Sequence, residues 1–372
     1  MGAGYSVYLS TPTGVRLADA SSFLKLEYAR TVNTIGSLTL TLPGTFNTQN
    51  IIAPDGRIEV WRRLPSGREY LDTDTVWFIQ GVTYEIDNAG MRTIVISADS
   101  GLFLLKDPGR FVDAFSGSAA ATKTDQADDM LKAIVREQAG SSASAARSLS
   151  AYLSVQADTA AAPTISKAFA WRPVLTVMQE IAQASFEAGT YLAFDIVSPT
   201  PDTLEFQTFI QQRGVDHRFP GGVNPVLLGP DMGNMGATSL SFDWRDEVSY
   251  AKAGGSGEES ARLTAEYLDA ARAAASPFRR RETFVQATNT KTAGALDDEA
   301  SAAVRGGRPR VILQGKIAST PDTQYGVDWA WGDFLTVQAF GQQLDARVDA
   351  IRVSVTPDEE NIEAVVRSET YL

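Results

Sequence analysis

The residue types that most often carry enzyme chemistry are scarce in this 372-residue chain, which has no cysteine and a single histidine, His217. Without cysteine, thiol nucleophiles, disulfides and cysteine-ligated zinc or iron–sulfur clusters are excluded. One imidazole excludes sites that need two, and a Ser–His–Asp triad would have to use His217, between Asp216 and Arg218. We therefore predict no catalytic, cofactor-binding or metal-binding residue, no cofactor, and a surface or loop position for His217.

Two short motifs allow both a functional and a structural interpretation. Residues 254–257 (GGSG) could hold a phosphate at the start of a helix, but no strand–lysine–threonine context accompanies them, so we favour a hinge. Residues 279–281 (RRR) could grip DNA or an acidic partner. The run is short and Glu282 follows it, so we favour a solvated or interface patch.

Aromatic and acidic residues near the C-terminus give two further candidates. Trp329 and Trp331 could form a stacking platform for sugars, but in a β-rich chain aromatic packing beside a turn is the favoured interpretation. Residues 358–360 (DEE) could supply the two carboxylates of a glycoside hydrolase. A run of like charges in a turn is solvated and its pKa values are not tuned, so we predict no catalytic role.

Composition is that of an ordinary globular protein, with 44% apolar and 21% charged residues. The net charge is −12, and no long segment has the basic surplus that tight binding to nucleic acid requires. No apolar run reaches the roughly 20 residues of a membrane span, and the N-terminus lacks a signal peptide. We expect no stable membrane insertion and no export through a signal peptide.

Apolar and polar residues alternate through the first third of the chain, at residues 24–28, 38–42, 58–60, 82–86 and 91–98. This period of two predicts antiparallel strands with one buried face, as in a small barrel or sandwich. The middle of the chain changes to a helical period at residues 125–139 and 173–187, with a hairpin from strands at 191–197 and 203–209. An α+β unit is predicted there.

The final third repeats the first in an interrupted form. Residues 240–244, 332–337 and 351–355 match residues 24–28, 55–60 and 82–86, and 361–366 follow as 91–96 do. Ser256 and Glu259 form a capping box before a helical run predicted at residues 258–275. We predict an α+β, mainly β chain: a first antiparallel β-barrel at 1–106, an α+β domain at 107–236, a related second barrel at 237–253 plus 309–372, and a helical insertion at 254–308. Any two antiparallel β domains share alternation, so chance similarity remains an alternative.

Together these segments resemble the siphophage tail-hub proteins, which are related in fold to the myophage baseplate hub and to the N-terminal part of tail-associated lysins. The segments that carry the resemblance are residues 26–42 (LEYARTVNTIGSLTLTL), 167–185 (KAFAWRPVLTVMQEIAQAS), 212–218, 247–262, 279–287 and 307–355. The family's anatomy of two β-barrels, a middle α+β domain and an insertion in the second barrel matches the predicted organisation.

The resemblance implies a structural, non-enzymatic hub at the tail tip of a virion or of a phage-tail-like particle, assembled in the host cytoplasm. Three copies with two barrels each would form a pseudo-sixfold ring between a sixfold tube and a threefold tip. The expected partners are the homotrimer itself, the distal tail protein ring, the C-terminal end of the tape-measure protein and a central tip or fibre protein. DNA would only pass through the lumen, and an acidic second barrel facing that lumen would repel it.

Two other functions remain open. A carbohydrate-binding or hydrolytic tail-tip module acting on the host envelope would place two carboxylates in one cleft. The chain ends soon after the last predicted strand, and for this reason we expect no lytic domain. A distal tail ring protein with sixfold symmetry would need no duplicated barrel, so the internal repeat argues against it.

Overall fold

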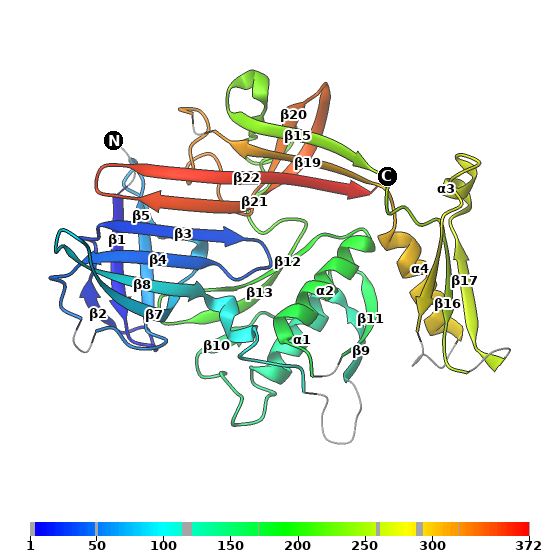
Figure 1. The fold of residues 1–372 in the computed structure, drawn as a ribbon, viewed down its shortest axis with the longest axis horizontal. Coiled ribbons are helices and arrows are strands. Elements are labelled where there is room, and N and C mark those ends of the chain that lie inside the picture. Colours follow the sequence, from blue (N-terminus) through cyan, green and yellow to red (C-terminus); the bar gives the residue numbers. More distant parts are fainter. Residues whose placement is uncertain are drawn as a thin grey trace.

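The computed structural model describes residues 4–48, 51–113, 121–169, 171–257, 261–287, 293–318 and 320–371. The chain is mainly β, with antiparallel sheets and few helices, which confirms the predicted α+β, mainly β class (Figure 1). The dominant element is a 14-stranded sheet built from both ends of the sequence.

The strands of this sheet fall into two sets. The first set consists of β1 (Gly4–Ser10), β2 (Arg16–Asp19), β3 (Lys25–Thr31), β4 (Ser37–Pro43), β5 (Arg57–Arg63), β6 (Glu69–Leu71), β7 (Trp77–Ile86) and β8 (Arg92–Ser100). The second set consists of β14 (Leu227–Leu228), β15 (Met235–Asp243), β19 (Arg310–Ile317), β20 (Phe334–Ala339), β21 (Gln342–Val355) and β22 (Glu360–Tyr371).

The two strand sets pair in the same order. Neighbouring strands run β3-β4-β8-β7 in the first set and β15-β19-β22-β21 in the second, and β5 and β20 then pair with β7 and β21. Both long hairpins have a register shift at the same place, between Ile79 and Gly81 in β7 and between Val348 and Ala350 in β21. A β-bulge is a specific local feature, so its repetition fixes which residues correspond.

The bulge and the pairing registers test the segment matches made from sequence. Residues 332–337 correspond to 55–60, and 351–355 to 82–86, as predicted. The match of residues 240–244 with 24–28 has the right strand and the wrong register. The pairing makes Met235 the counterpart of Leu26, because Met235 lies opposite Ile317 and Leu26 opposite Leu40. Alternating strands look alike after any even shift, so pattern alone could not fix this register.

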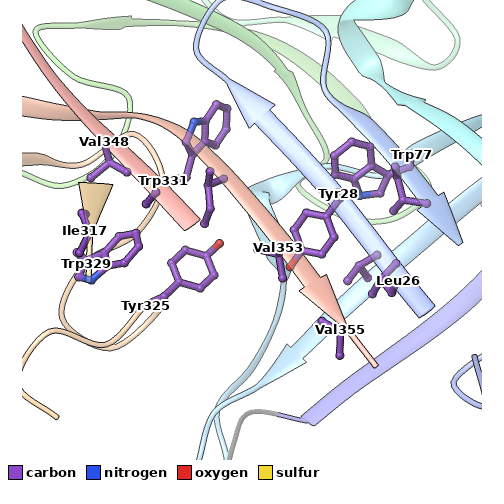
Figure 2. Packing of buried hydrophobic residues seen from close by; sticks show 14 of the residues in the cluster. Leu26, Tyr28, Trp77, Ile317, Tyr325, Trp329, Trp331, Val348, Val353 and Val355 are labelled. Carbon is purple, nitrogen blue, oxygen red and sulfur yellow. The ribbon is translucent and has the colours of Figure 1, made fainter. Parts of the chain in front are cut away.

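A ladder between β3 and β21 joins the two strand sets inside the chain. The fourteen-residue β21 pairs first with β20 and then, beyond its bulge, with β3. Both sets consequently share one apolar core, in which Tyr28 and Trp77 pack with Tyr325 and Trp331 (Figure 2). Pairing among the described residues is an open path from β15 to β2 and does not close either expected barrel.

The middle of the chain folds largely as predicted. Its elements are β9 (Ala121–Gln126), α1 (Ala127–Gln138), β10 (Leu153–Val155), β11 (Thr164–Phe169), α2 (Val174–Glu187), β12 (Leu192–Val197) and β13 (Leu204–Ile210). Both helices and the β12–β13 hairpin confirm the sequence prediction. The apolar faces of α1 and α2 share a second core with that hairpin and with Phe78 of the first strand set.

The insertion between β15 and β19 differs from the prediction. It contains β16 (Tyr250–Gly254), β17 (Thr264–Leu268), α3 (Ala270–Ala274), β18 (Glu282–Gln286) and α4 (Ala293–Gly306). The helix predicted at residues 258–275 is therefore wrong: β17 occupies its centre, while Glu259 of the proposed capping box lies outside the described residues. Pairing of β17 with β16, and packing of Ala265 in a small core with Leu296 of α4, outweigh the local helix propensity.

The insertion also begins earlier than predicted. β16 pairs with β17 and β18 and with no strand of the large sheet among the described residues, so the limit drawn at residue 254 falls at the end of an inserted strand. Figure 1 places the insertion at one end of the molecule, beside the C-terminal end of β22.

Candidate functional site

A buried polar cluster joins the two strand sets at the centre of the molecule. The carboxylate of Asp72, which is 1% exposed, accepts hydrogen bonds from the hydroxyls of Tyr28 in β3 and Tyr325 in the second half, the latter at 2.6 Å. Burial raises the pKa of Asp72, although these hydroxyls and Arg62 oppose the shift. Burial also raises the pKa of both tyrosines, so they remain hydroxyl donors. The hydrogen bonds of this cluster therefore hold the two strand sets together, and we call it the structural joint.

Arg62 extends this joint to β22. Its guanidinium contacts Glu360 at 2.9 Å and donates to the main-chain oxygen of Tyr325 at 2.8 Å, while the hydroxyl of Tyr5 donates to Glu360 at 2.5 Å. The acidic residues 358–360 were expected in a solvated turn. For Glu360 that expectation is wrong: its side chain is only 21% exposed, because the folded chain brings Arg62 from β5 to it.

A second buried cluster links β3 to the middle of the chain. The guanidinium of Arg30 contacts the Asp195 carboxylate of β12 at 2.5 Å, and Arg213 contacts the same oxygen at 2.9 Å. Arg30 lies over Trp77 and Trp331, with its central guanidinium carbon 5.8 and 4.5 Å from the two ring centroids. Cations on aromatic faces lose less solvation energy than isolated buried charges.

The two tryptophans considered as a sugar platform lie in the core. Trp329 is 3% and Trp331 is 4% exposed, and their indole nitrogens donate to the main-chain oxygens of Thr323 and Asp349. The packing interpretation is thus confirmed. Neither ring presents a face on which a sugar could stack.

His217 lies in a loop, which is one of the two positions expected for it, but it is buried and not at the surface. Its Nε2 lies 3.4 Å from the carboxylate of Asp333, and its Nδ1 contacts the main-chain oxygen of Val223. Asp333 in turn accepts main-chain hydrogen bonds from Val215 and Ala330, each at 2.6 Å. The His217–Asp333 pair fastens the loop before β14 to the turn before β20. The ring nitrogens face a carboxylate and a main-chain oxygen and not the serine hydroxyl of a Ser–His–Asp triad, which argues against such a triad.

The glycine-rich segment packs closely against its own chain. Arg262 donates to the main-chain oxygens of Gly254 and Gly255 at 3.0 and 3.2 Å. A Cβ at Gly254 would lie 2.5 Å from the Phe284 ring, so glycine there permits close packing within the inserted sheet. The segment does not start a described helix, as a phosphate cradle would require.

The arginine run holds the insertion to its connection. Arg279 contacts the buried Glu247 at 3.3 Å, and Arg280 contacts Glu282 at 2.7 Å. Arg281 donates to main-chain oxygens of residues 244 and 245. All three arginines have partners within this chain, and the interpretation as a solvated or interface patch stays a prediction.

A cavity of about 900 Å³ tests the hydrolytic alternative, because three carboxylates line it: Asp216, Asp345 and Glu369. Glu369 contacts Arg310 at 2.8 Å and Arg367 at 2.7 Å. Arg218 contacts Asp216 and Asp345, at 2.7 and 3.3 Å. The hydrogen bonds from Arg218 lower the pKa of Asp216. A general acid needs a raised pKa, so Asp216 does not fit the acid role in glycoside hydrolysis.

Two groups of exposed apolar side chains were not predicted. In β7, Tyr84 is 64% and Ile86 is 67% exposed, although alternation predicted one buried apolar face. Phe242 and Trp244, each 41% exposed, stack at the end of β15 with ring centroids 5.8 Å apart. The sequence carries no signal for this exposure, since β7 has the same alternation as its buried counterpart β21.

The described residues contain neither a membrane-spanning helix nor a metal-binding cluster of side chains. None of their helices has the length and apolar character needed to cross a bilayer. Among the same residues, no group of three histidine or acidic side chains is arranged to hold a metal ion.

Comparison with known proteins gives a family and a fold. The family model described as "Siphovirus ReqiPepy6 Gp37-like protein" matches residues 7–366. The prophage tail protein gp18 of Listeria monocytogenes EGD-e is 10% identical with a TM-score of 0.54, covering 98% of this chain and 94% of that chain. The 43 kDa tail protein of prophage MuSo2 from Shewanella oneidensis is 14% identical with a TM-score of 0.54, covering 97% and 98%.

A tail protein from Neisseria meningitidis MC58 has a TM-score of 0.53 at 14% identity, covering 98% of this chain and 97% of that chain. At these identities the likeness concerns the fold alone. No curated protein matches the sequence.

Proposed function

We propose, from the premise that this chain belongs to the Siphovirus ReqiPepy6 Gp37-like family of siphophage tail proteins, that it is the hub at the tail tip. A hub joins other tail components without needing chemistry of its own. Two titratable groups that the sequence analysis considered support this role, because His217 and Glu360 serve contacts inside the chain with Asp333 and Arg62.

The observation that carries the proposal is the repeated strand order β3-β4-β8-β7 and β15-β19-β22-β21. Three copies of a chain with two equivalent strand sets present six similar units, so a homotrimer can meet a sixfold tube on one side and a threefold tip on the other. We retain residues 1–106 and 309–372, with the segment around β15, as the two tube-like domains and 107–236 as the middle domain. The pairing of β16 favours an insertion that begins before Tyr250.

A polar face on the large sheet supports a role as a conduit for DNA. Side chains of this face are mostly serine, threonine and charged residues that pair with one another, such as Glu27 with Arg352 at 3.4 Å and Lys316 with Glu363 at 3.8 Å. Paired charges offer few free cations to phosphates, so DNA would slide along such a wall. An acidic lumen stays a prediction.

The proposed partners are a second and third copy of this chain, the distal tail protein ring, the end of the tape-measure protein and a central tip or fibre protein. The proposed location within the virion is the tail tip, after assembly in the host cytoplasm. We propose no enzymatic activity, because the carboxylate pair Asp216 and Asp345 is bridged by Arg218.

Mass and symmetry of the purified chain test this proposal. Light scattering behind size exclusion, followed by negative-stain imaging, is expected to give about three times 40.0 kDa and ring-shaped particles with an axial opening. Six identical copies per ring would favour the distal tail ring alternative. A monomer at all concentrations up to the solubility limit, with no rings, would refute the trimer.

A further inference from the structure

We propose that the cavity of about 900 Å³ binds an acidic peptide segment of another protein, through the guanidinium groups of Arg308 and Arg347 that line it. The segment would present a carboxylate next to an apolar side chain. This inference goes beyond the proposed hub and does not depend on its trimer, because every lining residue belongs to one chain.

The walls of the cavity come from parts of the chain that are distant in sequence. They are the end of α2 with the turn that follows it, the loop at residues 216–222, the β20–β21 hairpin, and the end of β22 together with Arg308. Figure 1 shows the C-terminal end of β22 beside the insertion. The cavity is therefore built where the second strand set packs against the middle of the chain.

The carboxylates of the cavity already have cationic partners. Arg218 contacts both Asp216 and Asp345, and two arginines that do not line this cavity contact Glu369. Consequently, no lining carboxylate is left for the other two lining arginines.

Arg308 and Arg347 are those arginines, and neither forms an ion pair with a described carboxylate. Burial lowers the pKa of both, whereas hydrogen bonding to Asp216 raises the pKa of Arg218. Asp349 acts on Arg347 only at longer range, and burial raises the pKa of this carboxyl, which weakens it as a counter-charge. A carboxylate from another molecule would supply the missing partner.

Aromatic rings hold both guanidinium groups in place. The central carbon of Arg347 lies 3.9 Å from the ring centroid of Tyr191 and 4.3 Å from that of Phe334, and Arg308 lies 4.2 Å over Tyr371. Main-chain oxygens accept one hydrogen bond from Arg347 and two from Arg308. The remaining N–H groups have no acceptor among the described residues. A planar guanidinium fixed by stacking is suited to bind a carboxylate through two parallel hydrogen bonds.

The lining favours a peptide carboxylate over nucleic acid. A nucleic-acid backbone presents closely spaced phosphates, which need more than two free cations, and the three lining carboxylates would repel it. An acidic side chain carries one charge, which a single arginine can meet. Phe186 and Phe219 line the same cavity, and Phe219 is 50% exposed, so apolar surface is available to a neighbouring side chain. An acidic segment with an adjacent apolar residue complements both features.

Fluorescence anisotropy with the purified full chain tests the site. The probe is a fluorescein-labelled peptide of three Gly-Glu-Phe repeats with blocked ends, and the neutral comparison peptide has glutamine in place of glutamate. The acidic peptide should bind about tenfold more tightly, because hydrogen bonds between charged partners are stronger than those to an amide.

Substitutions of both signs keep the test independent of folding. Arg308→Gln and Arg347→Gln should each weaken binding of the acidic peptide by about tenfold. The matched control is Arg305→Gln, which removes the same charge from an exposed arginine of α4 that does not line the cavity, and it should change affinity by less than about twofold. Asp345→Asn leaves Arg218 with one carboxylate and should strengthen binding by about threefold. A melting curve of each variant verifies that it is folded.

Several results would overturn the inference. Equal affinity for the acidic and neutral peptides, equal weakening by Arg305→Gln and Arg308→Gln, or no binding up to about 1 mM peptide would each exclude the site. Tighter binding of a labelled oligothymidylate that depends on Arg308 would assign the cavity to phosphates. Displacement of the probe by N-acetylglutamate as readily as by unlabelled acidic peptide would assign it to a free carboxylate. None of these results changes the mass or symmetry that test the proposed trimer.

Discussion

Replacing Asp195 with asparagine should destabilise the protein more than any exposed charge change, because this carboxylate neutralises two buried cations. Arg30 is 1% exposed and lies 2.5 Å from Asp195, and Arg213 lies 2.9 Å from the same oxygen. Asparagine keeps the shape and one acceptor. The substitution therefore removes the charge without opening a cavity.

The magnitude follows from the burial of the pair. Removing one partner of a buried ion pair costs about 3–5 kcal/mol, because the remaining charge stays desolvated. Burial already lowers the pKa of Arg30, which indicates that its charged form depends on this partner. Arg213 keeps a weaker contact with Asp74 at 3.4 Å, so we expect a loss of about 3 kcal/mol in the free energy of unfolding.

Urea unfolding followed by tryptophan fluorescence is a suitable assay, because Trp331 lies against both arginines. The matched control is Asp74→Asn, which removes a carboxylate from the same Arg213. The side chain of Asp74 is 69% exposed, so this control should cost less than about 1 kcal/mol. Equal small losses for both variants, with unchanged urea dependence, would refute the assignment of Asp195 as the essential counter-charge.

Four further predictions follow from the same contacts. Burial raises the pKa of Asp72, so the natural protein loses stability as rising pH deprotonates this carboxyl in the folded state. Asparagine cannot lose that proton. In paired urea titrations, Asp72→Asn should therefore gain stability relative to the natural protein as pH rises from about 4 to 8. Asp333→Ala should lower the melting temperature, since it strands two main-chain donors at about 1–3 kcal/mol each; an unchanged melting temperature contradicts this. Ile86→Lys should reduce association between copies of the chain by about tenfold or more in sedimentation, and should change monomer stability by less than about 0.5 kcal/mol, because Ile86 is exposed. Val355→Lys at the buried counterpart should unfold the chain. The insertion between β15 and β19 has its own small core. Replacing it by a short turn like residues 32–36 should therefore leave the β-sheet circular dichroism and the melting curve of the protein largely unchanged. Loss of cooperative unfolding would show that the large sheet depends on the insertion.

Local pattern determined most of the elements. The helical period at residues 125–139 and 173–187 predicted α1 and α2, and alternation at 38–42 and 351–355 predicted parts of β4 and β21. Segments 332–337 and 351–355 even had the correct register against the first half. These features depend on neighbours within a few residues, which the sequence displays directly.

Long-range pairing decided the rest. Residues 264–268 favour a helix locally and form β17 because β16 offers a partner edge. His217 is buried against Asp333, and Glu360 is partly buried against Arg62, although the partner lies far away in the sequence in both cases. Tyr84 and Val353 occupy the same position in identical alternation, yet Tyr84 is exposed and Val353 is buried. Among the described residues, Val353 pairs with a strand on each side, whereas Tyr84 pairs only with β8.

The sequence by itself determined which residues alternate, which coil into helices, and that the chain contains one motif twice. Tertiary structure alone decided which strand edges meet and which stay open. Alternation assigns a side chain to one face of a strand. Whether that face is buried depends on which other strand pairs beside it, and the whole fold decides which strand that is.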